Sequence, residues 1–306
     1  MLRTRTGSKM IRVHHSGKMG DVIYALPVMR ALHRIFGEKI HLTTSGLCWQ
    51  LVPLLWEQPY FEDVVVDETR PYSIPQDTGV SLNWDFYTEG QGINLSLQPA
   101  YYKLNAPISW TMAAAWIAGI DTLEQADFVA LPSLVNHRRW YHGVEVQYDG
   151  KPVTLTPTVV LAPEVESLDS APQGTWVRIA ERLHEAGFAV LVVGKQQDDA
   201  FPVYVTDLRG VTTVASMARL IAEATVFIGA HSFPWHVARH AGTPAICLQG
   251  WREGLRRCIP IDTVPERAPW VEPDHWTAAV EWAIQQGGGY EQSGRTRKGG
   301  DHLLRR

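Results

Sequence analysis

The chain has 306 residues, of which 45% are hydrophobic and 20% charged, enough for one large domain or two medium ones. Its formal net charge of −4 argues against general nucleic-acid binding through overall charge. The three cysteines form no C-x-x-C pair, which indicates a reducing compartment rather than a disulfide framework. The longest nearly apolar run, residues 110–120, is too short to cross a bilayer, and the basic start has no apolar signal core. We therefore expect a cytoplasmic protein without an integral membrane segment.

The first part of the chain alternates strand-like and helical patterns. Residues 10–15 read as a strand, and residues 16–21 (SGKMGD) as a glycine-bearing turn. A helical stripe of apolar residues follows, and Pro27 leaves two possibilities, a helix that begins near it or one that starts at Asp21 and kinks. A strand at residues 39–44, a short helix at 48–56 and a strand at 64–66 complete a βαβαβ pattern. This pattern predicts a doubly wound sheet.

A second cycle of strands and helices begins after residue 150, and residues 126–151, a mixture of short strand-like pieces, form the expected connection. The cycle comprises strands at 158–162 and 188–193, helices at 176–186 and 213–224, and a closing helix at 275–286. We expect domains at 10–150 and 151–286, with the closing helix near their junction. Residues 287–306 are glycine-rich and basic and are expected to form a flexible tail.

The stretch at residues 226–250 has the most distinctive pattern. A buried strand at 226–228 leads to a turn, Ser232 can cap a helix at 233–240, and a second strand follows Gly242. A helix that starts at the carboxyl end of a parallel strand presents free N–H groups that suit phosphate. An ordinary βαβ unit with no ligand has the same outline, so both interpretations remain open.

Two α/β halves, each with a phosphate-compatible turn, predict two Rossmann-like domains that face each other across a cleft. Glycosyltransferases of the GT-B type have this arrangement, with the nucleotide-sugar mainly on the C-terminal half. Periplasmic binding proteins share the outline but carry a signal peptide, for which the start of this sequence shows no pattern.

Two motifs resemble those of glycosyltransferase family 9, the ADP-heptose:lipopolysaccharide heptosyltransferase group. Residues 20–27, GDVIYALP, are similar to the family's G-D-x-x-x-x-x-P after the first strand. Residues 232–238, SFPWHVA, followed by 241–244, AGTP, are similar to the family's D-T-G-P-x-H-x-A-x-x-x-G-T-P. The order and spacing of the halves match over roughly residues 10–285.

The sequence departs from the family at the second motif. His231 stands where the family has Asp, Ser232 where it has Thr, and Phe233 where it has Gly. The family's H-P-G-A-like turn after the first strand of the second half is replaced by APEV at residues 162–165, and the lysine that typically follows it has no clear counterpart. These differences fall in the family's donor site.

The resemblance implies sugar transfer, hexosyl or heptosyl, from a nucleotide-diphosphate sugar to an acceptor hydroxyl with inversion. Such transfer needs a base for the acceptor and stabilisation of the leaving diphosphate. The resemblance assigns the base to Asp21, which could otherwise be only a helix cap. The expected donor- and phosphate-binding residues are Lys18, Gly20, Gly194, Lys195, His231, Ser232, Phe233 and His236. We expect no cofactor and no metal ion, because the positively poised turns replace a divalent cation.

Several alternatives remain. A zinc face from His231, His236 and His240 lacks a nearby carboxylate, and an NAD site lacks the G-x-G-x-x-G pattern. The acceptor could be a sugar, a glycolipid or, as in phage-type enzymes, a DNA base; only the basic arms at 3–9 and 295–306 favour nucleic acid. A non-catalytic nucleotide- or sugar-binding module is the alternative from another class.

Overall fold

The computed structural model describes residues 10–68, 92–96, 110–135, 146–148, 151–153, 156–163, 171–195, 197, 199–248 and 270–288. Both basic arms, the tail beyond residue 288 and most of the expected connection after residue 135 lie outside the described residues. Within the described ranges, no helix is both long enough and apolar enough to cross a bilayer.

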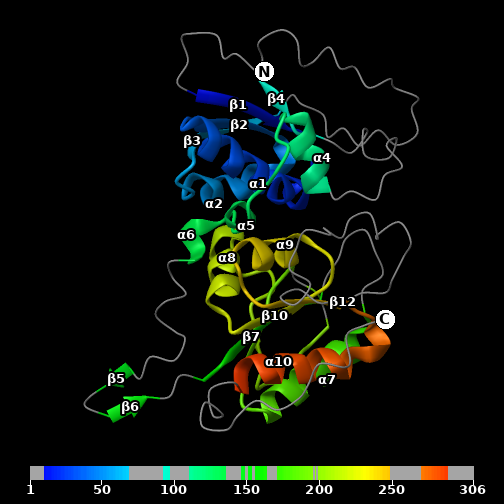
Figure 1. The fold of residues 1–306 in the computed structure, drawn as a ribbon. Helices are drawn as coiled ribbons and strands as arrows, with labels where there is room; N and C mark the ends of the chain where they lie inside the picture. Colours follow the sequence, from blue (N-terminus) through cyan, green and yellow to red (C-terminus); the bar gives the residue numbers. More distant parts are fainter. Residues whose placement is uncertain are drawn as a thin grey trace.

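The first half is built on a parallel sheet with the strand order β3-β2-β1-β4 (Figure 1). Along each strand, apolar residues either alternate with polar ones or follow one another, as expected for a sheet covered by helices. The described elements are β1 (Met10–His15), α1 (Met19–Phe36), β2 (Lys39–Ser45), η1 (Gly46–Leu51), α2 (Val52–Trp56), β3 (Phe61–Asp67), β4 (Ile93–Asn94) and α4 (Trp110–Ile117).

Helix α1 begins at Met19 and runs through Pro27 to Phe36. Proline removes one helical hydrogen bond and crowds the preceding turn. The bond that Pro27 removes is the one to the Ile23 carbonyl. At the next residue the Thr111 hydroxyl of α4 donates to the Tyr24 carbonyl at 3.1 Å, which ties this turn to a neighbouring helix. The helix ends at Gly37, which adopts the left-handed conformation (φ 69°) and donates its N–H to the His33 carbonyl.

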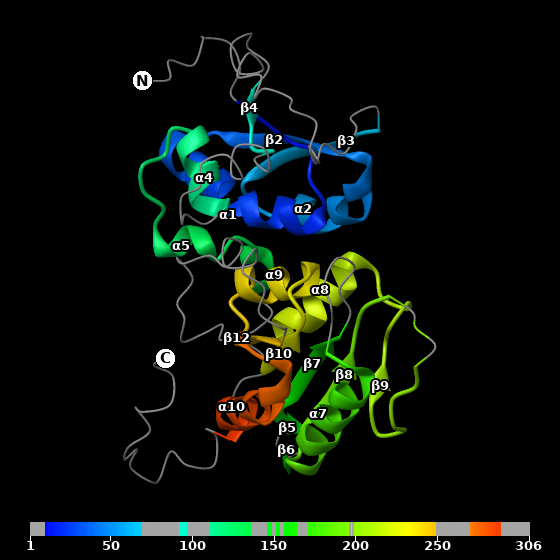
Figure 2. The same ribbon diagram turned by 90° about the vertical axis from the view of Figure 1, so that its right-hand side faces the viewer.

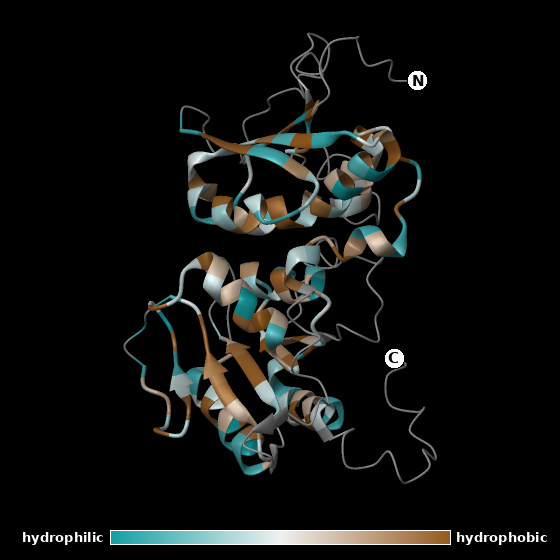
Figure 3. Ribbon diagram, turned by 90° about the vertical axis from the view of Figure 1, so that its left-hand side faces the viewer, coloured by the Kyte–Doolittle hydropathy of each residue, from teal (hydrophilic) through white to brown (hydrophobic). Residues whose placement is uncertain are grey.

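The second half is a parallel sheet with the order β12-β11-β10-β7-β8-β9. Figure 3 shows its central strands as largely hydrophobic and its helices as mixed, which is the pattern of a sheet buried on both faces. The elements are β7 (Thr158–Ala162), α7 (Gln173–Glu185), β8 (Ala189–Val192), β9 (Thr206–Asp207), α8 (Val214–Glu223), β10 (Val226–Gly229), α9 (Phe233–His240), β11 (Ala245–Leu248), β12 (Trp270–Val271), η5 (Pro273–His275) and α10 (Trp276–Gly288).

These two parallel α/β halves confirm the predicted fold class. Helices α8 and α9 cover the face of the second sheet that lies toward the first half, and α7 and α10 cover the opposite face (Figures 1 and 2). The prediction that the closing helix lies near the junction is wrong, because α10 packs on α7 and on β10, β11 and β12. Its apolar face fills the far side of the second sheet instead.

The expected connection is also more helical than predicted. Between the halves the chain forms α5 (Gln125–Phe128) and α6 (Pro132–Val135), and further on a small antiparallel hairpin of β5 (Val146–Tyr148) and β6 (Lys151–Val153). The carboxylate of Asp127 accepts the N–H of Glu124 at the start of α5, so a helical turn forms where the apolar pattern alone is too short to indicate one.

The two halves share one hydrophobic core. A single cluster of buried side chains runs from the β1–α1 layer through α8 and α9 to β7 and β11. At its centre α1 packs on α9: the rings of Tyr24 and His236 lie 4.3 Å apart, and a Cβ on Gly20 would lie 3.4 Å from Cδ2 of His236. A Cβ at position 20 would make an ordinary van der Waals contact there, so the surfaces of the two helices touch at this point.

The segment at residues 127–131, here called the strap, is held by both halves. Asp127 accepts two hydrogen bonds from the Arg34 guanidinium of α1, and Arg30 donates to the Val129 carbonyl. On the other side, Nδ1 of His240 lies 2.8 Å from the Phe128 carbonyl, and the Leu131 N–H donates to the His240 carbonyl. An ion pair between Arg219 of α8 and Glu57 also joins the halves.

Two histidines of α9 are buried in this junction. A carbonyl can only accept, so Nδ1 of His240 carries a proton and its Nε2 does not in the neutral ring. Burial, with the charge of Arg239, lowers the pKa of His240 to about 3. Burial, followed by His231, Arg239 and His240, lowers the pKa of His236 well below its usual value. Both rings are therefore neutral at pH 7.

Stability should fall as the pH falls below 6.5. The unfolded histidines bind protons near pH 6.5 while the folded ones do not, so the unfolded state gains up to about 1.4 kcal/mol per histidine for each pH unit below that value. For His240 the loss continues until its folded pKa of about 3 is reached. Urea unfolding at pH 7, 6 and 5 measures the slope.

His240→Gln keeps a donor for the Phe128 carbonyl but cannot titrate, and should flatten this slope. His184→Gln, on the exposed side of α7, is the control and should leave it unchanged. An unfolding free energy that is constant from pH 7 to pH 5, or an unaltered slope in His240→Gln, would contradict the burial argument.

Candidate functional site

Asp21 lies in the first turn of α1, directly after β1. Its Oδ2 accepts the backbone N–H of Lys18 at 2.9 Å, so the carboxylate caps the helix from its third position rather than from the N-cap. The preceding turn is fixed to the neighbouring β4 segment, because the Ser16 N–H donates to the Ser96 hydroxyl at 2.6 Å. Asp21 is thus held at the carboxyl end of β1, where parallel α/β sheets place their sites.

Gly17 is the residue around which this turn is packed, and sequence reasoning did not single it out. A Cβ at this position would lie 2.6 Å from Cβ of Asp21 and 2.7 Å from Cε1 of His15, closer than real contacts allow. The Gly17 carbonyl accepts hydrogen bonds from Ser45 Oγ at 3.2 Å and Cys48 Sγ at 3.3 Å. The only sequence signal for this role is the glycine itself, four residues before Asp21.

The groups beneath the turn are neutral at pH 7. Nδ1 of His15 accepts the Gly17 N–H at 3.0 Å, and burial lowers the pKa of His15 to about 4. Burial, opposed by the Ser45 hydroxyl and reinforced by the charge of Asp21, raises the pKa of Cys48 to about 11, so the thiol remains protonated and can donate to the Gly17 carbonyl. The side chains that support the Asp21 turn are therefore uncharged and hydrogen-bonded.

The second predicted turn follows β10 in the other half. The Ala230 N–H donates to the Ala162 carbonyl, which continues the sheet, and Ser232 is the N-cap of α9. The Ser232 hydroxyl donates to the Ala230 carbonyl at 3.4 Å and makes no cap bond. Phe233 is the first helical residue, so its N–H precedes the intrahelical bonds and remains a donor at the helix start.

Aromatic and basic side chains pack under this turn. His231 lies 5.3 Å from Trp235 and 4.9 Å from His236, measured between ring centroids. Burial, then the charge of Arg239, lowers the pKa of His231 to about 4, so without a bound anion its ring is neutral at pH 7. Arg239, four residues after Trp235, lies over that ring at 4.6 Å.

Arg239 is the second residue that sequence reasoning missed. Its guanidinium lies over the Trp235 ring of the same helix. Its charge adds to the burial that lowers the pKa values of His231, His236 and His240, and it opposes the burial that raises the pKa of Cys247. The i, i+4 spacing from Trp235 is the signal that could have indicated it. Together with the helix start, this cation makes the turn favourable for an anion.

The structure brings part of the predicted set together. Gly20 lies against His236 and the Phe233 backbone, so the start of α1 meets the start of α9 across the junction. Lys18 is exposed beside Asp21. Gly194 and Lys195 lie at the end of β8, and Gly194 (φ 137°) accepts the Gly210 N–H at 2.9 Å. In the sheet β8 is two strands from β10, so these two residues lie along the same edge, away from the α1–α9 contact.

In the described part of the chain, no three His, Cys, Asp or Glu side chains are grouped as possible ligands of a metal ion. His236 instead packs on Tyr24, and Nδ1 of His240 faces a backbone carbonyl.

No protein-family model matches the sequence, and no curated protein is significantly similar to it. Solved structures do match. Heptosyltransferase WaaC of E. coli is 12% identical with a TM-score of 0.55, over 90% of this chain and 99% of that one. ADP-heptose lps heptosyltransferase II of E. coli is 12% identical with a TM-score of 0.53, over 90% and 99%. A family 9 glycosyl transferase from Veillonella parvula is 14% identical with a TM-score of 0.55, over 89% and 88%.

These likenesses extend over nearly the whole of each chain, so both halves and their order along the sequence are shared. The chain therefore has the two-domain fold of the family 9 glycosyltransferases.

Proposed function

We propose that this protein is a glycosyltransferase that moves a sugar from a nucleotide-diphosphate sugar to an acceptor hydroxyl with inversion. In this proposal Asp21 is the general base. The start of α9, with Ser232, Phe233 and the charge of Arg239, binds the diphosphate. The observation that carries the proposal is the meeting of the two turns, at the contact between Gly20 and His236.

The geometry around Asp21 supports a base. An inverting transfer requires one group that takes the acceptor proton as the new bond forms on the face opposite the leaving diphosphate. The Asp21 carboxylate has one oxygen on the Lys18 N–H, which fixes its orientation at the end of β1. The packing of His15 and Gly17 against it limits other orientations, so a base positioned in advance is a reasonable function for this turn.

The donor turn supports diphosphate binding. A departing diphosphate needs positive charge and N–H donors in place before the reaction. The start of α9 supplies partial positive charge and the Phe233 N–H, and Arg239, which lies over Trp235 on the same helix, supplies a full charge. A bound anion would also favour the protonated form of His231, which burial disfavours in its absence. Ser232 in place of the family threonine keeps a hydroxyl.

The ligands of similar structures point in the same direction. WaaC was solved with ADP and with ADP-2-deoxy-2-fluoro heptose. By analogy we propose a nucleotide-diphosphate sugar as donor for this chain. The acceptor is proposed as a sugar or glycolipid hydroxyl. The basic arms that would favour a DNA base lie outside the described residues. A non-catalytic binding module would share the donor turn but would not need the oriented carboxylate of Asp21.

Asp21→Asn should lower turnover by about 10²–10⁴-fold, the usual contribution of a general base. Asparagine keeps an oxygen for the Lys18 N–H, so donor affinity and melting temperature should change little. Gly17→Ala provides an independent check: its Cβ would displace the carboxylate and should also lower kcat. Steady-state transfer and thermal melting measure both variants. Normal turnover in Asp21→Asn with a lower melting temperature would make Asp21 only a helix cap.

Ser232→Ala should weaken donor binding by about 1–3 kcal/mol if its hydroxyl donates to a charged phosphate oxygen. Ser232→Thr keeps the hydroxyl and should restore most of the affinity. Calorimetric titration with the donor measures both variants. Equal donor affinity for serine, alanine and threonine at this position would show that the diphosphate does not bind at the start of α9.

Transfer should continue in the presence of a chelator. The proposed turn neutralises the diphosphate with the helix start and Arg239, so a divalent ion has no required role. Activity is measured with EDTA, and again after Mg²⁺ or Mn²⁺ is added in excess. Complete loss with EDTA and recovery with either ion would overturn this part of the proposal.

A further inference from the structure

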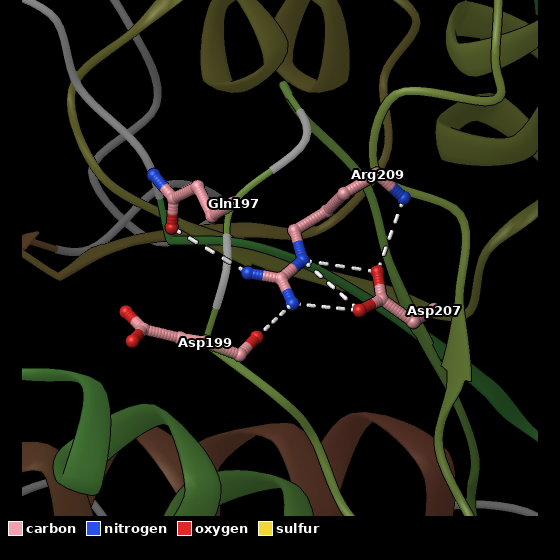
Figure 4. A network of polar contacts seen from close by, with 4 residues as sticks. All are labelled: Gln197, Asp199, Asp207 and Arg209. Carbon is pink, nitrogen blue, oxygen red and sulfur yellow. Dashed lines mark hydrogen bonds and ion pairs between the residues drawn. The ribbon is translucent and has the colours of Figure 1, made fainter.

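Arg209 forms the centre of a polar network at the edge of the second sheet (Figure 4). It follows β9, and its side chain is only 3% exposed. The guanidinium binds the Asp207 carboxylate with two groups, Nε to Oδ1 at 3.0 Å and Nη2 to Oδ2 at 2.6 Å. The hydrogen bond from Arg209 lowers the pKa of Asp207. This pair is therefore a fixed part of the sheet edge.

The same guanidinium reaches the segment that follows β8. Nη1 donates to Gln197 Oε1 at 3.4 Å, Nη2 donates to the Asp199 carbonyl, and the Phe201 ring lies 4.9 Å from the guanidinium carbon. Arg209 thus connects two strand ends that are adjacent in the sheet. All three guanidinium nitrogens of Arg209 thus have partners within the protein.

The network fixes which atoms face outward. Since Oε1 of Gln197 accepts from Arg209, the amide nitrogen lies on the other side, and Figure 4 shows it directed away from the guanidinium. Gln197 belongs to an exposed stretch, so its N–H₂ group can meet a ligand. Without Arg209 this side chain would be free to rotate.

The position of the network relates it to the donor turn. Strands β10, β7, β8 and β9 are neighbours in this order and all are parallel, so their carboxyl ends lie along one edge. The end of β8 is two strands from the end of β10, about 10 Å at the usual spacing. A nucleotide whose diphosphate lies at the start of α9 can therefore extend its nucleoside along this edge toward Gln197.

We propose that Arg209 is a positioning residue for the nucleoside end of the donor. It holds the segment after β8 against Asp207 and orients the Gln197 amide, which donates to the nucleoside. The inference rests on the proposed function, since it assumes a diphosphate at α9. It assigns a role to a buried cation that lies away from both motif turns.

The test compares ligands with and without a nucleoside. Arg209→Lys keeps the charge but cannot bind Asp207 with two parallel hydrogen bonds and reach Gln197 as well. The Kd values of UDP, ADP, GDP and inorganic pyrophosphate are measured by calorimetry on the full chain. Arg209→Lys should raise the Kd of the preferred nucleoside diphosphate about tenfold and leave that of pyrophosphate unchanged. In transfer assays KM for the donor should rise while kcat is retained.

Two further variants complete the experiment. Gln197→Ala, on an exposed side chain, should raise the same Kd, and the double variant should add little to either single change because the residues act through one contact. Arg182→Lys, on the exposed face of α7 and paired with Glu185, is the control and should bind all ligands normally. If Arg209→Lys does not fold, Gln197→Ala still tests the proposal.

The outcomes separate the two proposals. If the wild-type protein binds a nucleoside diphosphate and both Arg209→Lys and Gln197→Ala bind it equally well, the positioning role is wrong and the proposed function stands. If Arg209→Lys weakens pyrophosphate as much as the nucleoside diphosphate, its effect is general and the inference is also wrong. If the wild-type protein binds no nucleotide, the proposed function fails and this inference fails with it.

Discussion

The close packing of α1 on α9 is the constraint on which the rest of the site depends. Both helices start at the carboxyl end of a parallel strand, and each carries one of the two motif turns. They meet where Gly20 lies against the His236 ring, which also packs on Tyr24. This contact sets the distance between the carboxylate of one half and the helix start of the other.

The strap keeps this contact in place through polar groups. Arg34 holds Asp127 from the first half, and His240 holds the Phe128 carbonyl from the second. A buried carboxylate or imidazole without a partner would cost several kcal/mol, so these bonds favour one arrangement of the halves over others. The neutral state of the α9 histidines also favours this arrangement, because a charge on either buried ring would be poorly solvated.

The hydrophobic periodicity and the turn residues of the sequence were sufficient to predict the order of the helices and strands. The β10–α9–β11 unit is in place as predicted because its cap, glycine and proline signals agree with its apolar pattern. Pro27 did not decide where α1 starts, because apolar residues on both sides of it are buried in one continuous helix, and this packing offsets the bond that the proline removes. The position of α10 could not be predicted, since an amphipathic helix fits either face of a sheet and only tertiary packing selects one.

The candidate site was predictable to a smaller extent. Asp21, Ser232 and His236 were found through motif resemblance. Gly17 acts through close contacts with Asp21 and His15 that the sequence does not show, whereas the i, i+4 spacing of Arg239 from Trp235 was a usable signal. Arg239 lies over the Trp235 ring because the two side chains are on the same face of α9. A Cβ at position 17 would lie only 2.6 Å from Cβ of Asp21, and this closeness exists only in the folded turn. Such a role becomes visible only when side-chain packing is known.

The core that crosses the junction has a consequence for how the molecule can be divided. In many two-domain proteins each domain has a separate core, and either can be produced alone. Here α8 and α9 bury apolar side chains in the same cluster as α1 and the β1–β2 layer. A chain cut within the strap would leave each fragment with a large apolar surface in contact with water. The two fragments would then be expected to associate with each other, or to aggregate, rather than persist as separate folded units.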